Sequence, residues 1–351
     1  MAILRINATR DGVLSLTGGG DWQPALARAA ERLTPGAPVV ILVHGYRFTW
    51  VAGRDGARPY CPQDRLYRAD GPVARQGIWP RLASWPHSLG FTETGAEGLC
   101  IGFGWDARRA KLGTLIARGR CDFAEVFGAA AIAGEALARV TGALAAARPG
   151  VAPAFLTHSL GARVALAAMG ARPDLAHGPS VLLGAAEFTA TAGSVLAAQA
   201  AAGGGGPVTH VLSRANDLFD AAFATLAPVG RADRRTLGHA GLAAGLPGAA
   251  ARWLDLQLDA PATAAAFARR GVRLERSGER VSHWHFYTDP GAMEAWSAIL
   301  RGRPGWDLAS LRADGLAEAL APRWSRLIPA ARTLRPAAPS GLDQPGRARA
   351  A

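Results

Sequence analysis

One serine stands in a segment that is typical of a catalytic nucleophile. In FLTHSLGARVAL, an apolar run ending at Leu156 is followed by a small-x-Ser-x-Gly element around Ser159 and then by a helical pattern. A sharp strand-to-helix turn holds a serine hydroxyl exposed above a sheet, and the free N–H groups at the helix start favour a developing oxyanion. Gly161 is small enough for the close approach that this turn requires, whereas Thr157 is bulkier than the usual glycine. Ser159 is therefore the predicted nucleophile; the alternative is a serine that only caps a helix.

The same tetrapeptide, HSLG, occurs a second time from His87 to Gly90 and serves as an internal control. There it follows ASWP, which is no apolar strand, and it precedes FTETGAEG, which has no helical pattern. Because the flanking segments create the turn, Ser88 is not expected to act as a nucleophile.

A second strand with a suitable end precedes this serine. The apolar run from Val39 to Val43 ends in His44 and Gly45. The same architecture places an oxyanion donor after such a strand, so the N–H of Tyr46 is predicted to pair with that of Leu160. The alternative is an ordinary turn at the end of a strand. Four residues are expected to support the two turns: His44, Gly45, His158 and Gly161.

A serine nucleophile needs a base, and the base needs a group that orients it. The expected chain order is serine, acid, histidine. Asp217 directly follows the strand pattern VTHVLS and is the predicted acid, with Asp220 and Glu187 as alternatives. The segment RVSHWHFYTDP offers His283 and His285 ahead of a closing helix, and the residues themselves leave both open as the base.

Five segments together resemble the bacterial α/β hydrolases of a domain-of-unknown-function family, which are serine-hydrolase-like and related to lipases and esterases. They are HGYR, FGWDAR, THSLGARV, SRANDLFD and HWHFYTDP, and the resemblance covers the chain from Val39 to Leu300. It implies an α/β-hydrolase fold that cleaves an ester or related acyl bond through a Ser-His-Asp triad and an acyl-enzyme intermediate.

The resemblance also assigns single residues. Trp105 matches the tryptophan that follows the strand before the long helix, and Asp217 matches the aspartate after the Ser-Arg pair. The family's histidine precedes a proline by seven residues, which favours His283 as the base because Pro290 stands at that distance. The chain departs from the family at Asp106, where proline is common, and in a long irregular segment.

Alternating strand and helix patterns predict an α/β fold with a mainly parallel sheet and helices on both faces. We expect one domain over residues 1–334, with an insertion at about 48–98, a helical cap-like segment at about 228–278 and a disordered tail at 335–351. Strands are expected at Ala2–Leu16 (one or two), Val39–Val43, Leu99–Phe103, Val151–Leu156, Val181–Phe188, Val208–Ser213 and within GERVSHWHFY. Helices are expected at Asp21–Leu33, Asp122–Ala147, Gly161–Met169, Val195–Ala202 (or a loop), much of Leu237–Arg270, and Gly291–Leu300.

The net charge of +12 suggests nucleic-acid binding, but the composition argues against it. Lys111 is the only lysine among 39 basic residues, and the arginines are dispersed without an aromatic-interleaved basic stripe. The three cysteines have no CxxC spacing and are predicted to be reduced. Charges interrupt the N-terminus and the apolar stretch from Val181 to Gly206, so we expect a cytoplasmic protein with no membrane span.

Three other functions compete with hydrolysis. GFGWDA follows a strand and fits GxGxxA, which would suit a dinucleotide, but Trp105 and Asp106 crowd the pyrophosphate. A metal site is not expected because His and Asp do not cluster at tight spacing, and no cofactor is expected. A third possibility is a non-catalytic α/β-hydrolase scaffold. Under the preferred hypothesis the partner is a small-molecule or acyl substrate, with Trp79 and Trp85 as candidate pocket walls.

Overall fold

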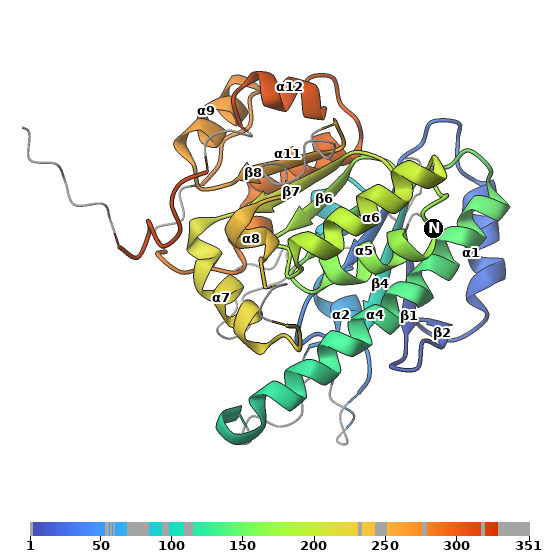
Figure 1. The fold of residues 1–351 in the computed structure, drawn as a ribbon. Helices are drawn as coiled ribbons and strands as arrows, with labels where there is room; N and C mark the ends of the chain where they lie inside the picture. Colours follow the sequence, from blue (N-terminus) through green and yellow to red (C-terminus); the bar gives the residue numbers. More distant parts are fainter. Residues whose placement is uncertain are drawn as a thin grey trace, which may run out of the picture.

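Eight strands form a single sheet in the computed structural model (Figure 1), in the order β2-β1-β4-β3-β5-β6-β7-β8. The structure describes residues 3–52, 56, 58, 60–68, 84–92, 98–108, 115–230, 234–242, 251–275, 279–316 and 320–328. The strands are β1 (Ile3–Ala8), β2 (Leu14–Leu16), β3 (Val39–Val43), β4 (Leu99–Trp105), β5 (Ala154–His158), β6 (Ser180–Leu183), β7 (Val208–Leu212) and β8 (Trp253–Gln257). Only β2 runs antiparallel to its neighbour, β1, and the other pairs are parallel.

The central strands are apolar on both faces, which explains why they lie between two layers of helices. In β3, Val39, Ile41 and Val43 belong to one hydrophobic core, whereas Val40 and Leu42 belong to the other. All five side chains are buried. The sequence prediction of a mainly parallel sheet with helices on both faces is therefore confirmed.

Helices cover both faces of the sheet. One face is covered by α1 (Trp22–Glu31), α4 (Leu115–Ala147), α5 (Gly161–Ala171) and α6 (Thr189–Ala202). The other is covered by α3 (Trp85–Ser88), α9 (Pro261–Arg269), α11 (Pro290–Leu300) and α12 (Leu308–Ala313). The connecting helices are α2 (Pro62–Arg65), the short 3₁₀ helix η2 (Arg214–Asn216), α7 (Asp217–Leu226), α8 (Leu237–Ala240) and α10 (His285–Thr288).

The helix α4 is the long helix in the foreground of Figure 1. Its portion Phe123–Ala147 is the one stretch, among the described residues, that is long and apolar enough to cross a membrane. More than half of its most apolar window is buried in the fold, against α1 and α5 among others. The core helix of a globular protein can be equally long and apolar, so the length and composition of α4 do not by themselves indicate a membrane span.

The segment 228–278, which the sequence predicts to be a helical cap, contains α8 and α9 but also supplies β8, which pairs with β7 at the edge of the sheet. The strand expected in GERVSHWHFY is wrong, because the end of that segment enters α10. Both faces of β8 are buried: Leu254 and Leu256 enter one core, and Asp255 on the other face pairs with His210 at 2.8 Å. The run LDLQLD from Leu254 to Asp259 alternates apolar and polar residues, which is a strand pattern that sequence reasoning missed. The tail 335–351 lies outside the described residues.

Candidate active site

Ser159 lies at the sharp turn between β5 and α5, with a backbone φ of 55°. A non-glycine residue in this left-handed region costs roughly 1–2 kcal/mol, so the surrounding contacts must hold the turn in place. The Ser159 N–H donates to the carbonyl of Leu183, and its carbonyl accepts from Ala186 and Ala162. These bonds tie the turn to the end of β6 and to the first turn of α5.

Two glycines allow the close packing around this turn. A Cβ on Gly161 would lie 2.3 Å from the carbonyl oxygen of Val43, and a Cβ on Gly45 would lie 2.8 Å from Cβ of Ser159. Both distances are below any real contact, so the ends of β3 and β5 approach each other only because neither residue has a side chain. The structure thus brings Gly45 and Gly161 to the turn, as the sequence predicts.

His44 orients the loop that follows β3. The backbone N–H of Trp105 donates to Nε2 of His44, so Nδ1 carries the proton and donates to the carbonyl of Gly45. Burial lowers the pKa of His44 to about 4, which keeps the ring neutral. In a planar trans peptide the N–H points opposite to the carbonyl, so this bond also fixes the direction of the Tyr46 N–H. The Leu160 N–H belongs to the start of α5, where a helix has no acceptor of its own.

His283 meets an asparagine. Its Nδ1 lies 2.6 Å from the amide oxygen of Asn216, whose nitrogen donates to Oδ1 of Asp220 at 3.0 Å. Because the amide oxygen only accepts, Nδ1 of His283 carries the proton and Nε2 is left unprotonated, as a general base requires. The ring of Phe219 stacks on His283 with 4.5 Å between centroids and fixes its plane.

Asp217, the predicted acid, has other partners. Its carboxylate pairs with Arg214 at 3.1 Å and accepts from the backbone N–H of Trp324 at 2.5 Å. The sequence expectation is corrected here, because the adjacent residue, Asn216, occupies the place beside His283. Sequence reasoning missed Asn216 because it considered only carboxylates, although an amide oxygen also accepts from an imidazole N–H.

Backbone contacts join the loop that carries Asn216 to the loop that carries His283. The N–H of Ser282 donates to the carbonyl of Ala215 at 2.9 Å. Asp259, which follows β8, accepts from the N–H groups of Arg214 and Ala215 at 3.1–3.3 Å. Asp259 is a further residue that sequence reasoning did not single out, and it fixes the start of η2.

His158 links the nucleophile turn to the same histidine loop. Its Nε2 donates to the carbonyl of His283 at 2.8 Å, and the two ring centroids are 4.4 Å apart. Burial lowers the pKa of His158 to about 3 and lowers the pKa of His283 well below its usual range, with a smaller contribution from neighbouring histidines. Both rings are therefore neutral at pH 7.

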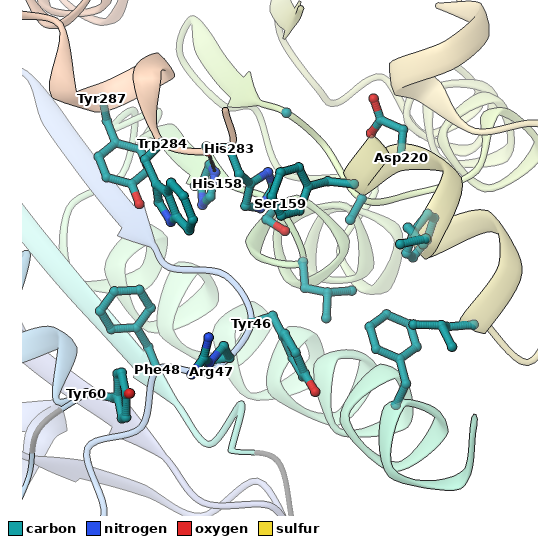
Figure 2. Close-up of a pocket in the computed structure, with 18 residues that line it drawn as sticks. Tyr46, Arg47, Phe48, Tyr60, His158, Ser159, Asp220, His283, Trp284 and Tyr287 are labelled. Atoms are coloured by element: carbon teal, nitrogen blue, oxygen red, sulfur yellow. Dashed lines mark hydrogen bonds between the residues drawn. The ribbon is translucent and has the colours of Figure 1, made fainter. Parts of the chain in front are cut away.

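A cavity of about 400 Å³ opens on Ser159 and His283. Figure 2 shows Ser159, His158 and His283 together on one wall, with Tyr46 across from them. Eight aromatic side chains line it: Tyr46, Phe48, Tyr60, Phe123, Phe219, Phe223, Trp284 and Tyr287. The chain has 25 aromatic residues of these types in total, so about a third of them surround this cavity. The site is suited to an apolar ligand.

Several alternatives from the sequence lie elsewhere. His285 is outside the cavity lining, and Glu187 is buried in an ion pair with Arg163 at 2.7 Å. Trp85, expected as a pocket wall, is fully buried in the core instead. Trp79 lies outside the described residues. Ser88 ends the short helix α3 and does not follow a strand.

The glycines of GFGWDA do not form a loop that could hold a pyrophosphate. They lie within β4, where a Cβ on Gly102 would strike the ring of Tyr67 and one on Gly104 would strike Asn7. Their smallness serves side-chain packing over the sheet, so the geometry does not favour the nucleotide alternative.

One group among the described residues could hold a metal ion: Asp217, Asp220 and His239. Arg214 already pairs with Asp217, and Arg323 lies 3.2 Å from Nε2 of His239. Two guanidinium groups beside these ligand atoms oppose the binding of a further cation.

Comparisons of the chain with protein-family models, with curated proteins and with solved structures found no match.

Proposed function

We propose that this protein is a serine hydrolase with an α/β-hydrolase fold, which cleaves an ester or related acyl bond. The observation that carries the proposal is Ser159 at a positive φ between β5 and α5, in one cavity with His283. The chain order Ser159, Asn216, His283 also supports it, because α/β hydrolases place nucleophile, orienting residue and histidine in that order. The loop after β3 lies where their second oxyanion donor is found.

In this proposal Oγ of Ser159 attacks the acyl carbon while its proton moves to Nε2 of His283. The N–H groups of Tyr46 and Leu160 bind the developing oxyanion. The bond to the leaving group then breaks, and the leaving group takes the proton from His283. Water attacks the acyl-enzyme with His283 again acting as base, which releases the acid and restores the serine.

Asn216 takes the role that an aspartate has in most serine triads. It orients the His283 ring and fixes its tautomer, but it has no charge to stabilise the imidazolium. A Cys-His-Asn arrangement works in this way in papain-like proteases. Asp220 in turn fixes which end of the Asn216 amide faces the histidine.

A fluorophosphonate probe tests the proposal directly, because it reacts with activated serines. Wild-type protein and the control Ser88→Ala are expected to be labelled, with the adduct on Ser159, and Ser159→Ala is expected to remain unlabelled. Hydrolysis of short para-nitrophenyl esters is expected to follow the same pattern. A folded wild-type protein that neither reacts with the probe nor hydrolyses these esters would contradict the proposal and favour the non-catalytic scaffold.

A further inference from the structure

The phenol of Tyr287 reaches the cavity, where no described residue forms a hydrogen bond with it. Tyr287 lies in α10, lines the cavity and is 1% exposed. Among the residues that the structure describes, none accepts from or donates to its hydroxyl. Figure 2 shows the hydroxyl directed away from α10, toward Trp284 and Phe48.

The Tyr287 hydroxyl is available to a ligand in the cavity. The hydroxyl borders the cavity and is not sealed in the core, but it gives up a bond that it could form, whereas phenylalanine would pack against the same rings without a polar group. Burial raises the pKa of Tyr287, so the hydroxyl keeps its proton and acts as a donor. A buried donor that faces a ligand cavity finds its acceptor when the ligand is bound.

The ring of Tyr287 is held rigidly, which fixes the position of its hydroxyl. Its centroid lies 4.8 Å from that of His158 and 5.2 Å from that of Trp85. Phe48, Tyr60 and Trp284 surround the same side of the cavity (Figure 2). These rings give apolar surfaces that contact a ligand mainly through van der Waals forces. The hydroxyl of Tyr287 adds a hydrogen bond, which depends on direction.

We propose that the substrate is an ester with an aromatic ring that carries an oxygen acceptor, and that Tyr287 selects it by donating a hydrogen bond to that oxygen. The inference rests on the proposed function, since it names the substrate class of the same site. Tyr287 is then a specificity-determining residue, and its hydroxyl contributes to recognition of the ring substituent without a part in proton transfer.

Matched ester pairs test this role. Para-nitrophenyl methoxybenzoates are compared with the ethylbenzoates of the same ring position, and methoxyphenyl acetates with ethylphenyl acetates, so that each pair differs in an ether oxygen and little in shape. Wild-type protein is expected to prefer the methoxy ester of at least one pair by about tenfold in kcat/KM. Tyr287→Phe is expected to abolish that preference by lowering kcat/KM for the methoxy ester alone.

Tyr67→Phe is the matched control, because Tyr67 is fully buried outside the cavity and donates to the carbonyl of Phe103. It is expected to keep the wild-type preference. A Tyr287→Phe protein that loses activity equally on both members of every pair, or on neither, overturns the inference while leaving the hydrolase proposal intact. If Ser159→Ala hydrolyses these esters as fast as wild-type protein, the hydrolase proposal fails. That result is separate from the test of Tyr287.

Binding supplies a readout that does not depend on turnover. The methoxybenzamide and ethylbenzamide that correspond to the preferred pair are titrated calorimetrically into Ser159→Ala and into Ser159→Ala with Tyr287→Phe. The methoxy compound is expected to bind about tenfold more tightly in the first protein and equally in the second. Equal affinities in both proteins would overturn the inference.

Discussion

The amide oxygen of Asn216 lies 2.6 Å from Nδ1 of His283, while the carboxylate of the next residue, Asp217, pairs with Arg214. Two adjacent residues thus have different tasks. Asn216 fixes the tautomer of the base in our proposal, and Asp217 holds η2 and the segment around Trp324 in place.

Substitutions at these two positions are expected to have different effects. Asn216→Ala removes the acceptor for Nδ1 of His283 and should lower kcat by roughly two to four orders of magnitude. It also leaves the buried Asp220 without its donor, so it should lower the free energy of unfolding by about 1–3 kcal/mol. Asp217→Asn breaks a buried ion pair and should lower the free energy of unfolding by about 3 kcal/mol, while the folded fraction keeps most of its kcat. Ester hydrolysis and denaturant unfolding measure the two effects. The reverse pattern would restore Asp217 as the residue that orients the base.

The two neighbouring histidines are expected to differ in the same way. His283→Ala should lower turnover by roughly three or more orders of magnitude, because the proton acceptor of the serine is lost. His285 does not line the cavity, so His285→Ala should retain activity within a few fold. Steady-state kinetics on one para-nitrophenyl ester separates them, and a dead His285→Ala protein would show that the base is misassigned.

A methyl group at Gly161 should disrupt the nucleophile turn. The added Cβ would collide with the backbone of Val43, so Gly161→Ala should lose most activity and destabilise the fold by about 1–3 kcal/mol. Gly128 in α4 is the matched control: nothing lies within 4 Å of its Cβ position, and alanine favours a helix. Gly128→Ala should therefore gain up to about 1 kcal/mol with unchanged activity. Unfolding midpoints and esterase assays of both variants check this, and a fully active Gly161→Ala protein would contradict the geometry.

Asp220 should make stability depend on pH. Burial, and secondarily the charge of Asp217, raises the pKa of Asp220 to about 8. Since the folded pKa exceeds the unfolded value near 4, the stabilising contribution is complete below pH 4 and is lost as the pH rises toward 8. Relative to Asp220→Asn, which removes the titrating group, wild-type protein should lose stability by up to about 1.4 kcal/mol per pH unit in this window. Unfolding both proteins in denaturant at pH 5, 6, 7 and 8 measures the difference, and a difference that is constant over this range would refute the prediction.

Local sequence was sufficient to predict the elements around the nucleophile. The apolar run of β3 appears with the predicted bounds, and the helix after Ser159 begins at Gly161 as expected. Asp21 caps α1 by accepting from the N–H of Gln23, at the start of the helix expected over Asp21–Leu33. These features depend on contacts between residues near in sequence and on a buried environment that any parallel sheet provides.

Tertiary structure decided which side chain meets His283. Asn216 and Asp217 are adjacent, so a shift of the chain by one residue within η2 would place Asp217 beside His283 and turn Asn216 away. That displacement is fixed by Asp259, by the N–H of Ser282 and by Trp324, which come from distant parts of the chain. No pattern within SRANDLFD contains this information.

Tertiary structure also decided the destinations of β8 and Trp85. The run LDLQLD from Leu254 to Asp259 already indicates a strand, but its place at the sheet edge depends on β7, where His210 lies opposite the buried Asp255. Trp85 enters the core beside Tyr287 rather than the cavity wall, because α3 packs against α11. The sequence by itself determined the strand–turn–helix that presents Ser159, since that unit is local. The partners of its histidine, the edge strand and the cavity wall were decided by contacts between segments far apart in the chain, which only the folded structure brings together.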